Sequence, residues 1–318
     1  MMNILIVGLG ALGTVYATFL KKGGHQVWAL TKEKYLPFFA EKKVITSGIW
    51  GEVSASLNGI SSCITPCLDV DFDLIILTVK SYDTYEAICQ VRPLVEERTL
   101  VLVAQNGYGN YETVSDVVGK SHTLLARIIF GARLRRMGEV EVTVMADKVR
   151  IGQPHGAVRE EAIVSLAEEM DRCGIPTAYD RDVYLLLWEK IIYNCALNPL
   201  GAILACSYGE LAENRETRKI MDGIIEEIFL VARTRGISLR FRDAEEYREI
   251  FYEKLLPPTA AHFPSMYYDL MAKKPLEIDS LNGAIVKLAK EAHLSVPVNE
   301  TIYHLIRAKE ANYRRKND

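Results

Sequence analysis

The sequence predicts an α/β domain followed by an all-helical domain, and three observations support this fold class. First, short runs rich in Val, Ile and Leu alternate with amphipathic segments in the first half, as in the βαβ units of a parallel sheet. Second, a run of period two, EVEVTVM, interrupts this pattern after Leu124. Third, only helical patterns follow Asp182. We therefore expect a doubly wound parallel sheet in residues 1–176 and helices in residues 177–318.

Length, charge and cysteine content narrow the class of protein. A chain of 318 residues is long enough for two domains. The net charge of -3 and the isoelectric point of about 6.1 argue against a nucleic-acid-binding surface, which is normally basic. The six cysteines have no CxxC spacing, so we expect free thiols in a reducing compartment, the cytoplasm. No metal site is expected, and Cys63 and Cys67 are interpreted as loop thiols.

The expected strands are short and apolar, and the expected helices are longer. The strands of the parallel sheet are NILIVG, HQVWAL, DLIILTV and TLVLVAQ. EVEVTVM and KVRIGQP are expected to extend this sheet, in part by antiparallel pairing. Helices are expected at 182–206, 214–236, 243–255, 265–273, 277–293 and 297–313, and YRRKND at the end as a solvated helix end. Asp182 and Asn214 are candidate N-caps, and Gly236 a candidate helix stop.

The motif GLGALG follows the first strand directly and opens a helix. Gly8 would permit the tight turn, Gly10 would let a pyrophosphate approach the backbone, and Gly13 would allow close packing of helix on strand. The helix start also offers free N–H groups to phosphates. The motif predicts dinucleotide binding rather than a turn that serves packing alone. Its residues are Gly8, Leu9, Gly10, Ala11, Leu12 and Gly13.

Polar residues follow three of the strands. Thr31 and Lys32 end the second strand, where an NAD site usually has an acidic residue, and they suit the 2′-phosphate of NADPH better. An ordinary exposed lysine is the alternative for Lys32. Lys80 and Asn106 close the next two strands, and ligands of doubly wound sheets lie beyond these strand ends. Either residue alone would be ordinary at a strand end or turn.

A polar ladder crosses the first long helix. Lys190, Asn194 and Asn198 stand four residues apart, so they share one face of a helix that is otherwise apolar. Val183–Cys206 is long enough to span a membrane, but its charged and amide groups favour a helix buried in a soluble protein. The alternative to a site is a structural hydrogen-bond network. Beside a nicotinamide, an ammonium could protonate the oxygen of a carbonyl that receives a hydride.

Seven motifs, in this order, resemble the ketopantoate reductase (2-dehydropantoate 2-reductase) family. They cover nearly the whole chain: GLGALG, TVKSYD, AQNGYG, IGQPHG, WEKIIYNCALNPL, FPSMYYDL and LEIDSLNG. The resemblance implies a Rossmann domain joined to a helical domain, with NADPH and a ketoacid bound in the cleft between them.

The resemblance also assigns roles to single residues. Lys190 would be the general acid, Glu277 would orient the substrate or the lysine, and Ser265 would bind the substrate carboxylate. Asn194 and Asn198 would contact substrate, while Lys80 and Asn106 would lie near the nicotinamide and ribose, with Asn106 also within reach of substrate. An N-cap is the alternative for Ser265, and a first-turn carboxylate the alternative for Glu277.

The sequence departs from the family pattern in three places. The apolar residues 128–130 replace a small polar segment and would make that wall of the cleft bulkier. Thr31–Lys32 replaces an arginine, and His262 stands where a small polar residue can occur. We therefore expect an NADPH-dependent reductase of 2-dehydropantoate in pantothenate biosynthesis, with a different branched 2-ketoacid or a non-catalytic NADP(H) sensor as alternatives. Its partner is a small molecule rather than nucleic acid or membrane, and a homodimer or a monomer is compatible with the sequence.

Overall fold

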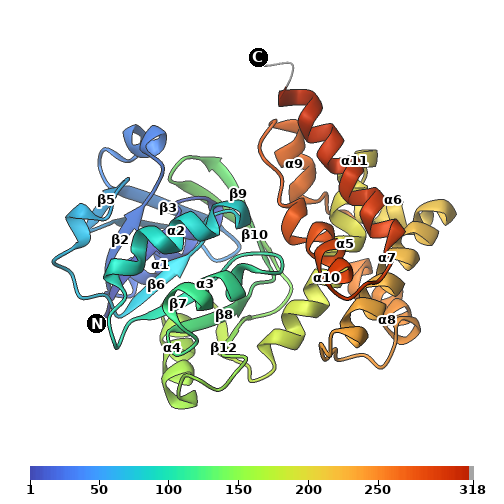
Figure 1. Ribbon diagram of the computed structural model, residues 1–318. Helices are drawn as coiled ribbons and strands as arrows, with labels where there is room; N and C mark the ends of the chain where they lie inside the picture. The colour runs from blue at the N-terminus through green and yellow to red at the C-terminus, as the bar shows by residue number, and fades with distance from the viewer. Residues whose placement is uncertain (315–318) are drawn as a thin grey trace. The chain divides into compact units, whose positions relative to one another are not determined.

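The computed structural model describes the backbone of residues 1–314 and the side chains of residues 1–313. The chain divides into two compact units (Figure 1). The first comprises Met1–Asn106 and Asn110–Tyr184, and the second comprises Gly107–Gly109 and Leu185–Asp318. Of the predicted helix end YRRKND, residues 313–314 belong to the last described helix and residues 315–318 lie outside the described residues.

The first unit is built on an eight-stranded sheet in the order β12-β11-β8-β7-β6-β1-β2-β5. The four strands predicted for the parallel sheet are all present and pair in parallel, in the order β7-β6-β1-β2. The strands are β1 Asn3–Val7, β2 Gln26–Leu30, β5 Gly59–Ser61, β6 Leu74–Leu77, β7 Leu100–Val103, β8 Thr123–Arg127, β11 Val149–Gly152 and β12 Thr177–Tyr179.

Helices cover both faces of this sheet, which explains why its central strands are apolar without interruption. Ile4 and Ile6 of β1 belong to a core shared with α1 and α4, whereas Leu5 and Val7 belong to a core shared with α2 and α3. The helices are α1 Ala11–Lys22, α2 Thr84–Val91, α3 Asn110–Val118 and α4 Glu160–Arg172. Short 3₁₀ helices lie at Glu33–Phe39, Thr65–Cys67, Ser81–Asp83 and Arg92–Leu94. The predicted doubly wound arrangement is confirmed.

A second sheet of four strands, in the order β4-β3-β10-β9, packs on the other side of α1. Its strands are β3 Lys43–Gly48, β4 Val53–Ser56, β9 Phe130–Arg136 and β10 Glu139–Met145. The expectation that EVEVTVM extends the main sheet is therefore wrong, because this run is β10. Val140 and Val142 face the α1 core while Glu139 and Glu141 stay more exposed, so the alternation reports one covered face and not the identity of the sheet. KVRIGQP does extend the main sheet, because β11 pairs antiparallel with β8.

The first unit continues past the predicted boundary at residue 176. β12 follows that residue directly and pairs in parallel with β11. The second unit takes over at Leu185, within the first turn of a long helix.

The second unit is helical, and each of the six predicted helical segments is found. Its helices are α5 Val183–Leu204, α6 Tyr208–Glu213, α7 Arg215–Thr234, α8 Ala244–Ile250, α9 Ser265–Met271, α10 Asn282–Glu291 and α11 Pro297–Arg314. A π-helical turn, Phe251–Leu255, continues α8, and 3₁₀ turns lie at Pro257–Thr259 and Ile278–Ser280. Asn214 caps α7 by accepting from the N–H groups of Glu216 and Thr217, and Gly236, with φ +66°, follows its end. Among the described helical elements of this unit, α6 and the 3₁₀ turn Pro257–Thr259 were not predicted.

Two further expectations concern the cysteines and the apolar helix α5. The cysteines are free thiols, and Cys67, Cys173 and Cys195 are buried. Within the described residues, no helix has the length and apolar character needed to cross a membrane, α5 included.

Candidate functional site

The glycine motif forms a tight loop between β1 and α1. Gly8 has φ +103°, a conformation that side chains other than glycine rarely adopt. A Cβ on Gly13 would lie 1.9 Å from the carbonyl oxygen of Gly8, so this glycine lets the helix approach the loop. Gly10 precedes α1 as its N-cap, is exposed, and has open space where a Cβ would be. The first turn of α1 carries no acidic residue. An open backbone at a helix N-terminus fits the pyrophosphate of a dinucleotide.

Thr78 anchors this loop from the end of β6. Its hydroxyl lies 2.6 Å from the carbonyl oxygen of Gly8 and 3.1 Å from that of Val7, and it donates to these acceptors. Thr78 opens the motif TVKSYD, but sequence reasoning did not single it out. Its position directly after a buried strand next to the glycine loop was the available signal.

The end of β2 carries the two residues expected at the 2′-phosphate. Thr31 is half-buried and its N–H donates to the carbonyl of Ser61. The ammonium of Lys32 is exposed and pairs with the carboxylate of Asp83 at 2.8 Å. Exposed pairs of this kind contribute little stability, so Lys32 can still bind an anion. Asp83 nevertheless places a negative charge close to the expected phosphate position.

Lys80 and Asn106 lie at equivalent ends of neighbouring strands, as predicted. Leu77 of β6 pairs with Val103 of β7, and each polar residue stands three positions beyond its paired strand end. Lys80 is half-buried and Asn106 is exposed.

A buried side-chain network fixes the chain beside Asn106. Gln105 donates to the carbonyl of Val79 at 2.9 Å and to the hydroxyl of Thr84 at 2.7 Å. Thr84 in turn donates to Asn110, whose amide donates to the carbonyl of Asn106.

Gly107 makes a sharp turn with φ +89°, a conformation that favours glycine. A Cβ on Gly107 would lie 2.5 Å from the Oγ of Ser280, and the N–H of Tyr108 donates to the carbonyl of Ser280 at 2.8 Å. The glycine is therefore needed for packing inside the helical unit.

The polar ladder lies on α5 as its spacing predicts, but its members differ in burial. Trp188, Ile191, Ile192 and Cys195 are at most 1% exposed, whereas Lys190 and Asn194 are half-buried. Half-burial leaves both polar groups accessible, as contact with a substrate requires.

The two amides of the ladder also differ in their partners. Asn198 is 8% exposed and its carbonyl accepts from the hydroxyl of Tyr208 at 2.6 Å. Burial raises the pKa of Tyr208, which keeps this donor protonated. Within the described residues, the Asn194 amide makes no side-chain hydrogen bond. A structural network thus accounts for Asn198 in part and does not account for Asn194.

The purely structural interpretations of Ser265 as an N-cap and of Glu277 as a first-turn carboxylate do not match where these residues lie. Ser265 is exposed and is the first residue of α9, whose N-cap is Pro264, so the N-cap interpretation is wrong. Glu277 is half-buried and precedes the 3₁₀ turn Ile278–Ser280, so it is not a first-turn carboxylate of α10. The segment around Glu277 is held on one side by Tyr303, whose hydroxyl donates to Asp279 at 3.0 Å.

The apolar residues 128–130 belong largely to the core of the first unit. Ile128 is 7% exposed within the core next to α1, and the ring of Phe130 packs on that of Trp50 with centroids 4.8 Å apart. The bulk of these two side chains serves the packing between α1 and the second sheet. Their bulk is therefore a weaker argument against a small ketoacid substrate than the sequence alone indicated.

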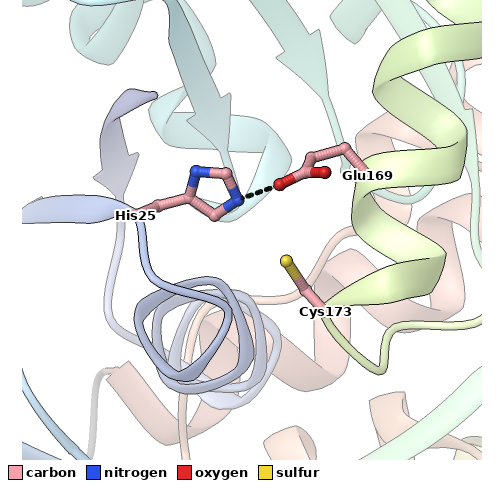
Figure 2. Close-up of side chains that lie close together, drawn as sticks. All are labelled: His25, Glu169 and Cys173. Atoms are coloured by element: carbon pink, nitrogen blue, oxygen red, sulfur yellow. Dashed lines mark ion pairs between the residues drawn. The ribbon is translucent and has the colours of Figure 1, made fainter. Parts of the chain in front are cut away.

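One group of potential metal ligands lies in the first unit, formed by His25, Glu169 and Cys173 (Figure 2). The Nε2 of His25 lies 2.7 Å from the Glu169 carboxylate, while its Nδ1 accepts from the N–H of Met2 at 3.0 Å. A metal on Nε2 would require a proton on Nδ1, and that proton would face the Met2 N–H. Arg172 also pairs with Glu169. The group therefore fits a link between His25, which directly precedes β2, and α4 better than a metal site.

Family models match both units of the chain. The model of the ketopantoate reductase PanE/ApbA family matches residues 4–156, and the model of its C-terminal part matches residues 182–310. The 2-dehydropantoate 2-reductase of Aquifex aeolicus is 44% identical over 311 residues, which is 97% of each chain. That of Pyrococcus horikoshii is 29% identical over 98% of each chain.

Solved structures show the same fold. A PanE/ApbA family ketopantoate reductase from Ralstonia eutropha has a TM-score of 0.85 at 27% identity, covering 98% of this chain and 100% of that one. D-mandelate dehydrogenase with NADH and anilino(oxo)acetate has a TM-score of 0.86 at 25% identity, covering 98% and 99%.

The glycine loop, the doubly wound sheet and the helical unit define an NAD(P)H-dependent oxidoreductase of two units. Within that class, the chain belongs to the ketopantoate reductase family, as the two family models and the 44% identical relative show.

Proposed function

We propose that this protein reduces 2-dehydropantoate to pantoate with NADPH, as a step of pantothenate biosynthesis in the cytoplasm. The observation that carries the proposal is the ladder on α5. There a half-buried ammonium stands on one face with a half-buried amide that has no side-chain partner among the described residues. Identity of 44% to a 2-dehydropantoate 2-reductase over 97% of both chains supports it.

In the proposed reaction the nicotinamide, when bound, supplies a hydride to the ketone carbon. Lys190 stabilises the negative charge that grows on the ketone oxygen and donates a proton to it. Glu277 orients the lysine or the substrate. Asn194, Asn198 and Ser265 bind the substrate, with Ser265 on its carboxylate. Asn106 and Lys80 lie near the ribose and nicotinamide, and Asn106 also reaches the substrate.

We propose NADPH as the preferred cofactor because of the residues after β2. The loop from Gly8 to Gly13, which includes Leu9, Ala11 and Leu12, holds the pyrophosphate. Thr31 offers a hydroxyl and Lys32 a cation to the 2′-phosphate, and the first acidic residue after β2, Glu33, follows both of them.

The test is NADPH oxidation with 2-dehydropantoate and a panel of 2-ketoacids, including the 2-ketoacid that corresponds to mandelate. We expect the highest kcat/KM with 2-dehydropantoate. Turnover of another ketoacid with none of 2-dehydropantoate would assign the substrate to the second hypothesis, a reductase of another branched 2-ketoacid. NADPH binding without turnover of any acid would support a sensor. Light scattering on the same sample decides between monomer and homodimer.

A further inference from the structure

The helix that carries the ladder contains a proline, and this proline leaves one backbone carbonyl without its usual partner. Pro199 lies inside α5 and has no N–H, so the carbonyl of Cys195, four residues earlier, has no helical donor. Cys195 is 0% exposed, so water does not reach this carbonyl from the surface. A buried carbonyl without a hydrogen bond is costly.

Asn282, the first residue of α10, supplies the missing donor. Its side-chain amide donates to the carbonyl of Cys195 at 3.3 Å and to the Oδ1 of Asn299 at 3.0 Å. Asn282 is 0% exposed. Both neighbours are acceptors, so the NH₂ group and not the oxygen must face them.

The far side of this contact is itself fixed. The amide of Asn299 donates to the carbonyl of Ile224 at 3.3 Å and to the carboxylate of Glu227 at 2.8 Å. Glu227 also accepts from the backbone N–H groups of Val298 and Asn299. Asn282 therefore joins α5 to a rigid polar network of α7 and α11.

We propose that Asn282 is a positioning residue that replaces the hydrogen bond lost at Pro199 and thereby holds the ladder in register with Glu277. Cys195 lies between Asn194 and Asn198, and Glu277 precedes Asn282 by five residues in LEIDSLNG. One amide thus ties the proposed acid helix to the segment of the proposed carboxylate. The catalytic consequence rests on the proposed function, whereas the structural one does not. Misplacement of reacting groups by about 1 Å can cost about 100-fold in rate.

The experiment is a double-mutant cycle of Asn282→Ala and Pro199→Ala. Pro199→Ala restores an N–H that can donate to the Cys195 carbonyl, which makes Asn282 less necessary. We expect Asn282→Ala alone to lower the unfolding midpoint by about 4 °C or more. We also expect it to lower kcat about tenfold or more while leaving the Kd of NADPH unchanged. In the Pro199→Ala background, the shift of the unfolding midpoint caused by Asn282→Ala should be at most half as large. The logarithm of the fold-loss in kcat should also be at most half as large.

The control cycle pairs Pro199→Ala with Thr217→Val, which removes a buried hydroxyl that donates to backbone carbonyls of Leu211 and Asn214. These two changes should be additive. If Asn282→Ala costs as much in the Pro199→Ala background as in the parent protein, the proposal is overturned. If Asn282→Ala does not fold, folding of the double variant supports it and failure of both contradicts it. Absence of ketoacid reduction in the parent protein would count against the proposed function alone, because the unfolding cycle is independent of activity.

Discussion

Lys190 is the side chain on which the proposed chemistry depends. We expect Lys190→Ala to lower kcat by about 10²–10⁴-fold, the usual contribution of a positioned general acid. The Kd of NADPH should change little, because the lysine acts on the ketone oxygen. Stopped-flow reduction and cofactor titration measure the two quantities. Lys287→Ala, which removes an exposed lysine of α10, is the matched control and should retain the parent rate. Equal rates in the two variants would remove Lys190 from the mechanism.

The pair of Lys32 and Asp83 makes a second prediction, about cofactor choice. Lys32→Ala should raise the KM for NADPH about five- to tenfold, because a charge-assisted contact with the 2′-phosphate is lost. Asp83→Asn should lower it about two- to threefold, because a negative charge 2.8 Å from the ammonium disappears. Neither variant should change the KM for NADH by more than about twofold. Parallel changes for both cofactors would show that Lys32 does not read the phosphate.

For single residues, sequence spacing predicted which side chains share a helix face but not which hydrogen-bond partners they find. The spacing of four placed Lys190, Asn194 and Asn198 on one face of α5. It could not indicate that the hydroxyl of Tyr208 donates to Asn198, because that contact depends on where α6 turns back. The capping box of Ser207 and Glu210, which starts α6, was the local signal that could have revealed this helix.

Substitutions in the loop between β1 and α1 can separate its role in packing from its proposed role in cofactor binding. A Cβ on Gly13 would meet the carbonyl of Gly8 at 1.9 Å, so Gly13→Ala should lower both the free energy of unfolding, by about 1–3 kcal/mol, and NADPH affinity. Gly10 has open space around it and φ -81°. Gly10→Ala should therefore cost less than about 1 kcal/mol of stability, yet weaken NADPH binding about tenfold by occupying the phosphate approach.

Urea unfolding and cofactor titration of the two glycine variants check this prediction. Unchanged NADPH affinity in Gly10→Ala, in a protein as stable as the parent, would show that the pyrophosphate does not approach the loop there. Equal losses of stability in the two variants would contradict the packing assigned to Gly13.

Among the described strands, β1, β2, β6, β7, β10 and β11 were predicted, whereas β3, β4, β5, β8, β9 and β12 were not, and the partners of β10 were assigned wrongly. The run EVEVTVM was recognised as a strand because Val140 and Val142 alternate with polar residues. Its sheet was assigned wrongly because its partners β3 and β9 are set by the fold. The pairing of β10 with β3, in which Val140 lies opposite Thr46, spans more than ninety residues of sequence. The central strands of the main sheet were easier to predict, since β1, β6 and β7 are each followed by a helix, α1, α2 and α3.

For the whole molecule, the link formed by His25 and Glu169 makes stability depend on pH. Burial lowers the pKa of His25 more than the neighbouring carboxylate raises it, so the folded protein favours the neutral ring. Arg172, by its hydrogen bond, and His25 hold the pKa of Glu169 at about 2. Both groups therefore bind protons more weakly in the folded than in the unfolded chain. Such groups stabilise the fold above their unfolded pKa and lose that contribution as the pH falls.

His25 and Glu169 lose their contributions to stability in different pH ranges, so their effects can be measured separately. The contribution of His25 is complete above about pH 6.5 and declines below it, whereas that of Glu169 declines from about pH 4.5 toward pH 2. We expect the unfolding midpoint of the parent to decrease as the pH is lowered from 7.5 to 5, and to decrease less in His25→Gln. His262, whose pKa burial also lowers, accounts for part of the remaining slope, so His25→Gln/His262→Asn should be flatter still.

Thermal unfolding monitored by circular dichroism at several pH values measures these slopes. His304→Gln, which changes an exposed ring, should keep the slope of the parent. If the midpoint of the parent instead rises on acidification and His25→Gln abolishes that rise, attraction to Glu169 outweighs burial. The folded protein would then favour the charged ring. A slope that His25→Gln leaves unchanged would show that the link between His25 and α4 does not titrate in this range.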